Sequence, residues 1–138
     1  MNSKEFFYNL GRAIYHIDSL YDDFAKSSGV SPTLLWILYA LNDSKPHTQR
    51  DICLDWGLPK STVNTVVTEL KNNGYVTLKK VEGTRREMTV LLTDTGKIFA
   101  DKVLANIYSK EAEVFNLLNS SDLELPRALN KITELLKK

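Results

Sequence analysis

The chain has 138 residues and a formal net charge of +1, with 43% hydrophobic and 25% charged residues. This length fits a single domain, no apolar run is long enough to span a bilayer, and no secretory signal opens the chain, so we expect a soluble, cytoplasmic protein without a membrane partner. One cysteine excludes an internal disulfide framework. His16, His47 and Cys53 match no zinc spacing, so neither a metal nor another cofactor is expected.

Two helices are predicted in the first third of the chain. From Ser3, a residue suited to cap a helix, apolar side chains recur every three or four residues as far as Phe24, and Ser27-Ser28-Gly29 ends the pattern. Ser31-Pro32 then opens a second segment, Thr33–Leu41, which is apolar on most sides. We expect this segment to form the buried centre of the fold.

Residues 48–74 predict two helices joined by a tight turn. Thr48 can cap the first helix, Gly57 gives the backbone freedom that the turn needs, and Pro59 fits the first turn of the second helix. The apolar side chains of both helices recur at helical spacing and are expected to face the core. They are Ile52, Cys53 and Trp56 in the first helix and Val63, Val66, Val67 and Leu70 in the second.

The opposite face of the second helix carries short polar and cationic side chains and almost no acid before Glu69. It consists of Lys60, Ser61, Thr62, Asn64, Thr65, Thr68 and Lys71. An Asn can bond adenine through two hydrogen bonds, a Thr methyl can contact thymine, and Ser, Thr and Lys can bind phosphates. This face therefore predicts contact with double-stranded DNA. The alternative is a solvated helix face that happens to be rich in Thr.

A β-hairpin is predicted to follow. Tyr75–Val81 and Glu87–Thr93 alternate as two strands, and between them Glu82-Gly83-Thr84-Arg85-Arg86 places a glycine at the bend and two arginines near the tip. Such a wing can reach a minor groove or the flanking phosphates. Charge distribution agrees: residues 45–86 hold eight Lys/Arg and four Asp/Glu, a net +4, and the remainder is −3.

The C-terminal region again predicts helices. Thr93 or Asp94 can start a long amphipathic helix that Asn119-Ser120 interrupts. Ser121-Asp122-Leu123-Glu124 is similar to a capping box, but Pro126 requires that the last helix begin near Glu124 or bend there. We expect the amphipathic terminal helices to pack against a second copy of the chain. The alternative is that they fold back on their own domain.

The order of these elements resembles the MarR family of winged-helix transcriptional regulators. The motifs that carry the resemblance are Lys60-Ser61-Thr62-Val63, the run from Leu70 to Val76, Arg86 seven residues before Thr93, and the Leu-Thr-Asp-Thr-Gly sequence at residues 92–96. The fold class implied is mainly α with a small β-wing (α+β). One domain, 1–138, would contain a DNA-binding winged helix-turn-helix at 31–93, with dimerisation helices at 1–28 and 94–138.

The resemblance also implies a function: a homodimer on a pseudo-palindromic operator, usually a repressor, released from DNA by a small ligand or an oxidant. Carried over by position, the residues that would contact DNA are Thr48, Gln49, Lys60, Ser61, Thr62, Asn64, Thr65, Thr68, Lys71, Arg85 and Arg86. A cleft for a small-molecule effector would be lined by aromatic residues, with Tyr15, His16, Trp36 and Tyr39 as candidates. The same residues also fit a simple core.

Two features depart from the family pattern. Thr84 stands where many members have an Asp that holds the wing arginine, so Glu82 or Glu87 would have to replace it. The only cysteine, Cys53, lies in the apolar pattern of a helix, where we expect an inert buried thiol. Catalysis is not expected, because no nucleophile–base pair or phosphate-binding glycine loop is present. The alternative function is a winged helix that binds a protein rather than DNA.

Overall fold

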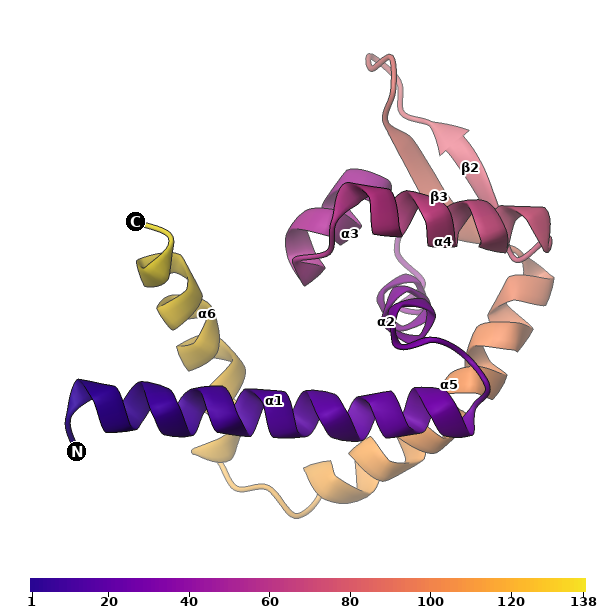
Figure 1. The fold of residues 1–138 in the computed structure, drawn as a ribbon. Helices are drawn as coiled ribbons and strands as arrows, with labels where there is room; N and C mark the ends of the chain where they lie inside the picture. The colour runs from indigo at the N-terminus through magenta and orange to yellow at the C-terminus, as the bar shows by residue number, and fades with distance from the viewer. The chain divides into compact units, whose positions relative to one another are not determined.

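The computed structural model describes all of residues 1–138, and the chain forms two compact units, residues 1–105 and 106–138. The first unit contains, in order, α1 (Ser3–Ser27), α2 (Pro32–Leu41), β1 (His47–Thr48), α3 (Gln49–Trp56), α4 (Lys60–Asn72), β2 (Val76–Lys80) and β3 (Met88–Leu92) (Figure 1). Helix α5 (Asp94–Phe115) begins in this unit and ends in the second, which also holds η1 (Asp122–Glu124) and α6 (Leu125–Leu136). The predicted fold class is confirmed. None of the helices is both long enough and apolar enough to cross a membrane.

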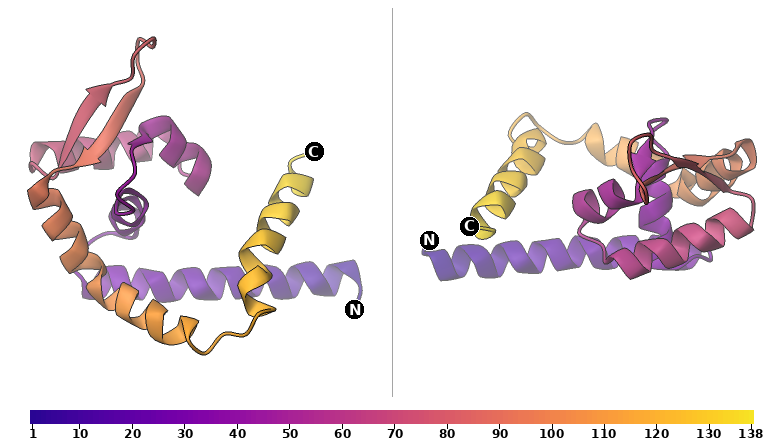
Figure 2. Two further views of the ribbon diagram at one scale, coloured as in Figure 1. Left: turned by 180° about the vertical axis from the view of Figure 1, so that it is seen from behind. Right: turned by 90° about the horizontal axis from the view of Figure 1, so that it is seen from above.

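The sheet has three antiparallel strands in the order β1-β3-β2. Strands β2 and β3 form the predicted hairpin, with Val76 opposite Leu92 and Lys80 opposite Met88. Gly83 has a φ of 79° at the turn, a backbone conformation that costs a glycine little. Seen from behind, the hairpin projects beyond α3 and α4 as a wing (Figure 2). Strand β1 was not predicted, because its two residues are too few to show an alternating pattern.

The core of the first unit lies around α2 and α4. Five residues of α2 are buried, as expected for the apolar centre: Leu35, Ile37, Leu38, Ala40 and Leu41. Ser31 caps this helix by accepting a hydrogen bond from the Leu34 N–H, and Pro32 occupies its first turn. Helix α4 buries Val63, Val66, Val67 and Leu70, the four residues that its periodicity predicted. Its opposite face is therefore turned to solvent.

Helix α1 is buried only near its C-terminus. Asn2, rather than the predicted Ser3, caps the helix, because the Asn2 side chain accepts a hydrogen bond from the Glu5 N–H and Ser3 is already helical. Ala25 is the one buried residue of α1. The N-terminal half of the helix extends away from the winged-helix elements (Figures 1 and 2). Its apolar stripe therefore meets no partner within this unit.

A tight backbone contact joins the start of α5 to the start of the wing. A Cβ on Gly96 would lie 1.8 Å from the carbonyl oxygen of Tyr75, so only glycine fits there. The Thr93 hydroxyl donates to the Gly74 carbonyl over 2.7 Å and accepts from the Gly96 N–H over 2.9 Å. The rings of Tyr75 and Phe99 stack beside this contact, with their centroids 4.2 Å apart. The corner between α4 and β2 is thereby fixed to α5.

The second unit differs in one detail from the sequence prediction. Asn119, not Ser121, caps the turn before α6: its side-chain oxygen accepts from the Asp122 N–H over 3.0 Å, and the Asp122 carboxylate accepts from the Asn119 N–H over 3.0 Å. The Ser121 hydroxyl instead donates to the Asn119 side chain. Helix α6 begins at Leu125, which places Pro126 in its first turn, where the missing N–H costs nothing.

The Gly96 contact predicts a large loss of stability on a small substitution. Gly96→Ala should lower the free energy of unfolding by about 3 kcal/mol, because either the new methyl group or the Tyr75 backbone must move. The measurement is urea unfolding followed by circular dichroism. Gly11→Ala is the matched control, since Gly11 is helical and has nothing within 4 Å of its Cβ position. It should raise stability by about 1 kcal/mol, and equal effects of the two variants would contradict the packing account.

Candidate nucleic-acid interface

Helix α3 and the turn after it set the position of α4. Thr48 and Asp51 form a capping box: the Thr48 hydroxyl accepts from the Asp51 N–H over 3.0 Å, and the Asp51 carboxylate accepts from the Thr48 N–H over 3.3 Å. Gly57 ends α3 in the left-handed conformation, with a φ of 63°. Thr48 also belongs to β1, which pairs with β3. The start of α3 is therefore tied to the base of the wing.

The N-terminus of α4 has free backbone donors. Pro59 occupies the cap position and supplies no side-chain hydrogen bond, and the first backbone bond within the helix runs from the Val63 N–H to the Pro59 carbonyl. The N–H groups of Lys60, Ser61 and Thr62 consequently have no acceptor in the helix. Such groups, with the helix dipole behind them, favour an anion.

Most of the predicted DNA-contacting side chains on α4 are exposed. Lys60, Ser61, Asn64, Thr65, Thr68 and Lys71 are exposed, and Thr62 is half-buried. Two of the hydroxyls are already in use: Thr65 donates to the Ser61 carbonyl over 2.9 Å and Thr68 to the Asn64 carbonyl over 2.7 Å. The side chains of Ser61 and Asn64 make no hydrogen bond within the protein. The exposed face thus offers a mixture of free polar groups and methyl groups.

A cleft of about 400 Å³ lies where α3, the start of α4 and the wing meet. Its lining includes three cationic side chains, from Arg50, Lys60 and Arg86, together with Gln49. Cys53, Leu54, Glu87 and Met88 complete the lining. Three residues predicted to contact DNA, Gln49, Lys60 and Arg86, are thus brought together from segments far apart in the sequence. Arg50 was missed by the sequence analysis, although it lies in the first turn after the Thr48 cap.

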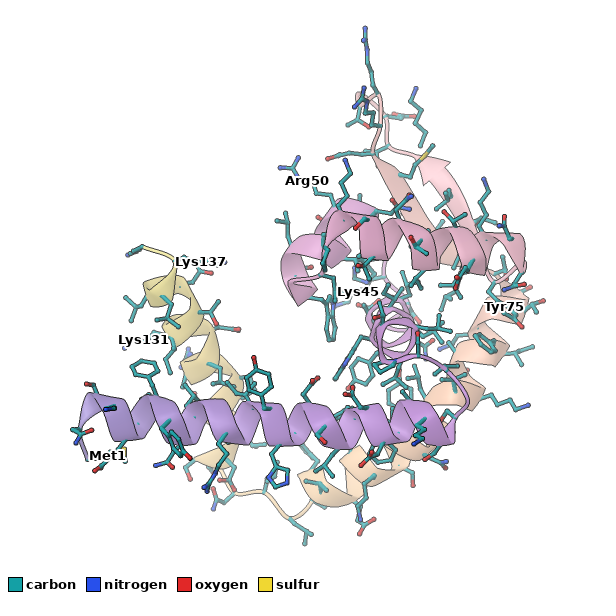
Figure 3. All side chains as sticks on the ribbon, in the orientation of Figure 1. Met1, Lys45, Arg50, Tyr75, Lys131 and Lys137 are labelled. Carbon is teal, nitrogen blue, oxygen red and sulfur yellow. The ribbon has the colours of Figure 1, made fainter.

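The wing is tied to α3 by an ion pair. The Arg50 guanidinium lies 3.5 Å from the carboxylate of Glu87, the residue just before β3 at the end of the wing turn. Figure 3 labels Arg50. Glu87 therefore does not replace the missing aspartate beside Arg86, as the sequence analysis suggested, and Glu82 does not either, since Arg86 forms no ion pair. Thr84 instead donates its hydroxyl to the Val81 carbonyl over 2.8 Å and closes the turn. Arg85 and Arg86 are both exposed and free to meet a phosphate.

The loop before β1 is held by hydrogen bonds to the Asp43 carboxylate. The hydrogen bond between His47 Nε2 and Asp43 Oδ1, 2.7 Å long, holds the pKa of the Asp43 carboxyl below its ordinary value. The same carboxylate oxygen accepts from the Lys45 N–H over 3.0 Å. Asp43 therefore stays ionised at neutral pH and fixes the loop that leads into β1 and α3.

The four residues predicted to line an effector cleft are divided between two places. Trp36 and Tyr39 are half-buried on α2 and belong to an aromatic cluster with Tyr21 and Trp56. The ring of Trp36 lies 5.5 Å from that of Trp56, which was not among the predicted effector residues. Tyr15 and His16 are exposed on α1, outside this cluster. The effector itself stays a prediction.

Cys53 is less enclosed than its sequence pattern indicated. It is half-buried and lines the cleft beside the cations, whereas the neighbouring Ile52 is the buried residue of α3. The reason is geometric: Cys53 follows Ile52 directly, and consecutive residues of a helix lie about 100° apart around its axis, so Cys53 points away from the side that Ile52 buries.

Two helices joined by a tight turn and followed by a β-hairpin wing define the winged helix-turn-helix class. Residues 28–87 match the MarR family model, and no curated protein sequence matches the chain. The chain is 27% identical to NMB1585, a MarR family regulator from Neisseria meningitidis, over 99% of this chain and 95% of that one, with a TM-score of 0.82. AbsC, a MarR family transcriptional regulator from Streptomyces coelicolor, shares 22% identity over 99% and 96% of the two chains, with a TM-score of 0.73.

The fold also matches overoxidized AbfR bound to DNA, with a TM-score of 0.69 and 19% identity over 98% of this chain and 96% of that one. AbfR is a protein of Staphylococcus epidermidis. At this identity the likeness concerns the fold alone. The winged-helix region, residues 28–87, matches the MarR family model, and the chain shares its architecture with MarR family regulators along its whole length.

The capping box at α3 predicts a measurable contribution to stability. Thr48→Ala should lower the free energy of unfolding by about 1 kcal/mol, because the Asp51 N–H loses its acceptor. Thr48→Ser keeps the hydroxyl and should retain most of the stability. Urea unfolding of the three proteins tests this, and an equal loss in Thr48→Ser would assign the contribution to the methyl group rather than to the cap.

Proposed function

We propose that this protein binds a pseudo-palindromic DNA operator as a homodimer and represses transcription from it. The observation that carries the proposal is the convergence of Lys60, Arg86 and the free N-terminus of α4 beside an exposed polar helix face. A helix of this kind, with a wing next to it, has the dimensions to enter a major groove while the wing reaches the adjacent backbone.

Backbone phosphates are the ligands that this corner of the molecule favours. The N–H groups at the start of α4 point along the helix axis, and Lys60 and Arg86 place positive charge beside them. Gln49 and Arg50 add donors from α3. Contacts of this kind position a protein on DNA without reading the sequence. We therefore assign Lys60, Arg86 and Gln49 to the backbone and the exposed face of α4 to the bases.

The homodimer is supported by apolar surface that has no partner. On α1, Phe6, Phe7, Ile14, Ile17 and Leu20 are each 40–54% exposed. On α6, Leu125, Leu135 and Leu136 are 52–70% exposed. Apolar patches of this kind mark interaction sites in proteins of this size. In a twofold dimer the two copies of α4 would lie about 34 Å apart and could enter successive major grooves.

The phosphate assignment predicts how binding depends on salt. Lys60→Ala and Arg86→Ala should each weaken binding to all duplexes and reduce the slope of log affinity against log salt by about one. The measurement is fluorescence anisotropy with the duplex next to the protein's own coding region and with a random duplex, at several salt concentrations.

Lys102→Ala is the control for these variants, because Lys102 is an exposed lysine on α5, away from the cleft. It should leave the salt slope unchanged. If all three variants behaved alike, net charge rather than the cleft would account for binding. If the wild-type protein bound no duplex in preference to random DNA, the proposed function would fail, and a protein-binding winged helix would become the better account.

The dimer proposal predicts that a charge on the apolar stripe of α1 separates the protomers. Ile17→Glu should convert a dimer into a monomer in sedimentation equilibrium and should lower affinity for a two-half-site operator far more than for a single half-site. Leu91→Glu is the matched control, since Leu91 is 36% exposed on β3, outside the two helical segments 1–28 and 94–138 that are expected to form the dimer. A wild-type protein that sediments as a monomer at all concentrations would contradict the proposal.

A further inference from the structure

Thr65 and Thr68 lie one turn apart on the exposed face of α4, and the hydroxyl of each already donates a hydrogen bond to the backbone of the helix. Thr65 Oγ1 donates to the Ser61 carbonyl over 2.9 Å, and Thr68 Oγ1 donates to the Asn64 carbonyl over 2.7 Å. A hydroxyl carries a single hydrogen, so neither side chain can donate to a base while these bonds hold. The groups left to meet a ligand are the two γ-methyls and the lone pairs of each oxygen, which can only accept a hydrogen bond.

Asn64 differs from its neighbours because its amide is free. The side chain is exposed, and none of its oxygen or nitrogen atoms is hydrogen-bonded within the protein. A free carboxamide presents a donor and an acceptor side by side. This pair matches the N6 donor and the N7 acceptor of adenine in the major groove, and it matches no other base as well.

These three side chains form one reading stripe. Residues 64, 65 and 68 are one, three or four positions apart, so they lie close together on one side of the helix. With a rise of about 1.5 Å per residue, Asn64 and Thr68 are about 6 Å apart along the axis. Base pairs are separated by about 3.4 Å, so the stripe covers about two adjacent base-pair steps.

We propose that this stripe selects an adenine and adjoining thymines in each half-site, Asn64 reading the adenine and the methyls of Thr65 and Thr68 packing on the thymine 5-methyl groups. This inference rests on the proposed DNA-binding function and specifies its ligand. Thymine is the only one of the four bases that offers a methyl group in the major groove. In this proposal the threonine hydroxyls bond to the helix backbone, and the threonine methyls contact the thymine methyls.

The test removes the thymine methyl group from the DNA and, separately, the methyl or the hydroxyl group from each threonine. A randomised duplex pool is first selected on the wild-type protein to obtain the preferred half-site. Each thymine of that half-site is then replaced by deoxyuridine, which removes only the 5-methyl group. On the protein, Thr65→Ser and Thr68→Ser remove the methyl and keep the hydroxyl, whereas Thr65→Val and Thr68→Val do the reverse.

Deoxyuridine should weaken wild-type binding about fourfold at a contacted thymine, the factor that corresponds to one methyl group leaving an apolar contact. Thr65→Ser or Thr68→Ser should cause a similar loss on the thymine duplex and no additional loss on the matching deoxyuridine duplex. The two valine variants should bind as the wild type does. Asn64→Ala should abolish the preference for adenine at one position.

Thr133→Ser is the matched control, because Thr133 on α6 makes the same bond to the carbonyl four residues earlier, 2.9 Å from the Leu129 oxygen. It should respond to deoxyuridine as the wild type does. If the valine variants lost binding and deoxyuridine had no effect, the hydroxyls would read the bases and the inference would be overturned while DNA binding stood. If selection yielded no preferred sequence, both this inference and the proposed function would be overturned.

Discussion

Burial of one side of α4 against the apolar core fixes the rotation of the helix and therefore which side chains the other side presents to solvent. Val63, Val67 and Leu70 are at most 2% exposed, so the helix cannot rotate about its axis without bringing these side chains into water. Each of them contributes about 1.5–3 kcal/mol when buried, a sum that no surface contact on the opposite face could match. Asn64, Thr65 and Thr68 are therefore presented to solvent in a fixed orientation before any ligand arrives. A surface that is already ordered loses less conformational entropy when it binds a ligand.

Three connections hold the wing in a defined position relative to this helix. Strand β1 adds backbone hydrogen bonds between the start of α3 and β3, and the Arg50–Glu87 ion pair joins the same two elements at the surface. The Gly96–Tyr75 contact then fixes the beginning of the hairpin to α5. The ion pair is exposed and contributes little by itself. The close backbone packing at Gly96 is the stronger constraint, because it leaves no room for even one methyl group.

The polar groups of α3 and α4 fall into two kinds with different physical roles. Some are consumed by the fold: the Thr48 hydroxyl caps α3, and the hydroxyls of Thr65 and Thr68 bond to their own helix. Others, such as the Asn64 amide and the first N–H groups of α4, have no acceptor or donor in the protein. Groups of the second kind can form hydrogen bonds only with water or with a ligand. A residue type in a sequence does not reveal to which kind it belongs.

The amino-acid sequence by itself determined the elements whose signals are local. Apolar spacing identified both faces of α4, Thr48 and Gly57 marked the limits of α3, and alternation around Gly83 identified the wing. Such signals arise from contacts within a few residues, so a pattern suffices to read them. Only the tertiary structure decided what depends on distant segments: strand β1, the use of Glu87 by Arg50 instead of Arg86, and the partial exposure of Cys53. Each of these three features depends on contacts between segments that are distant in the sequence, and local residue spacing does not predict such contacts.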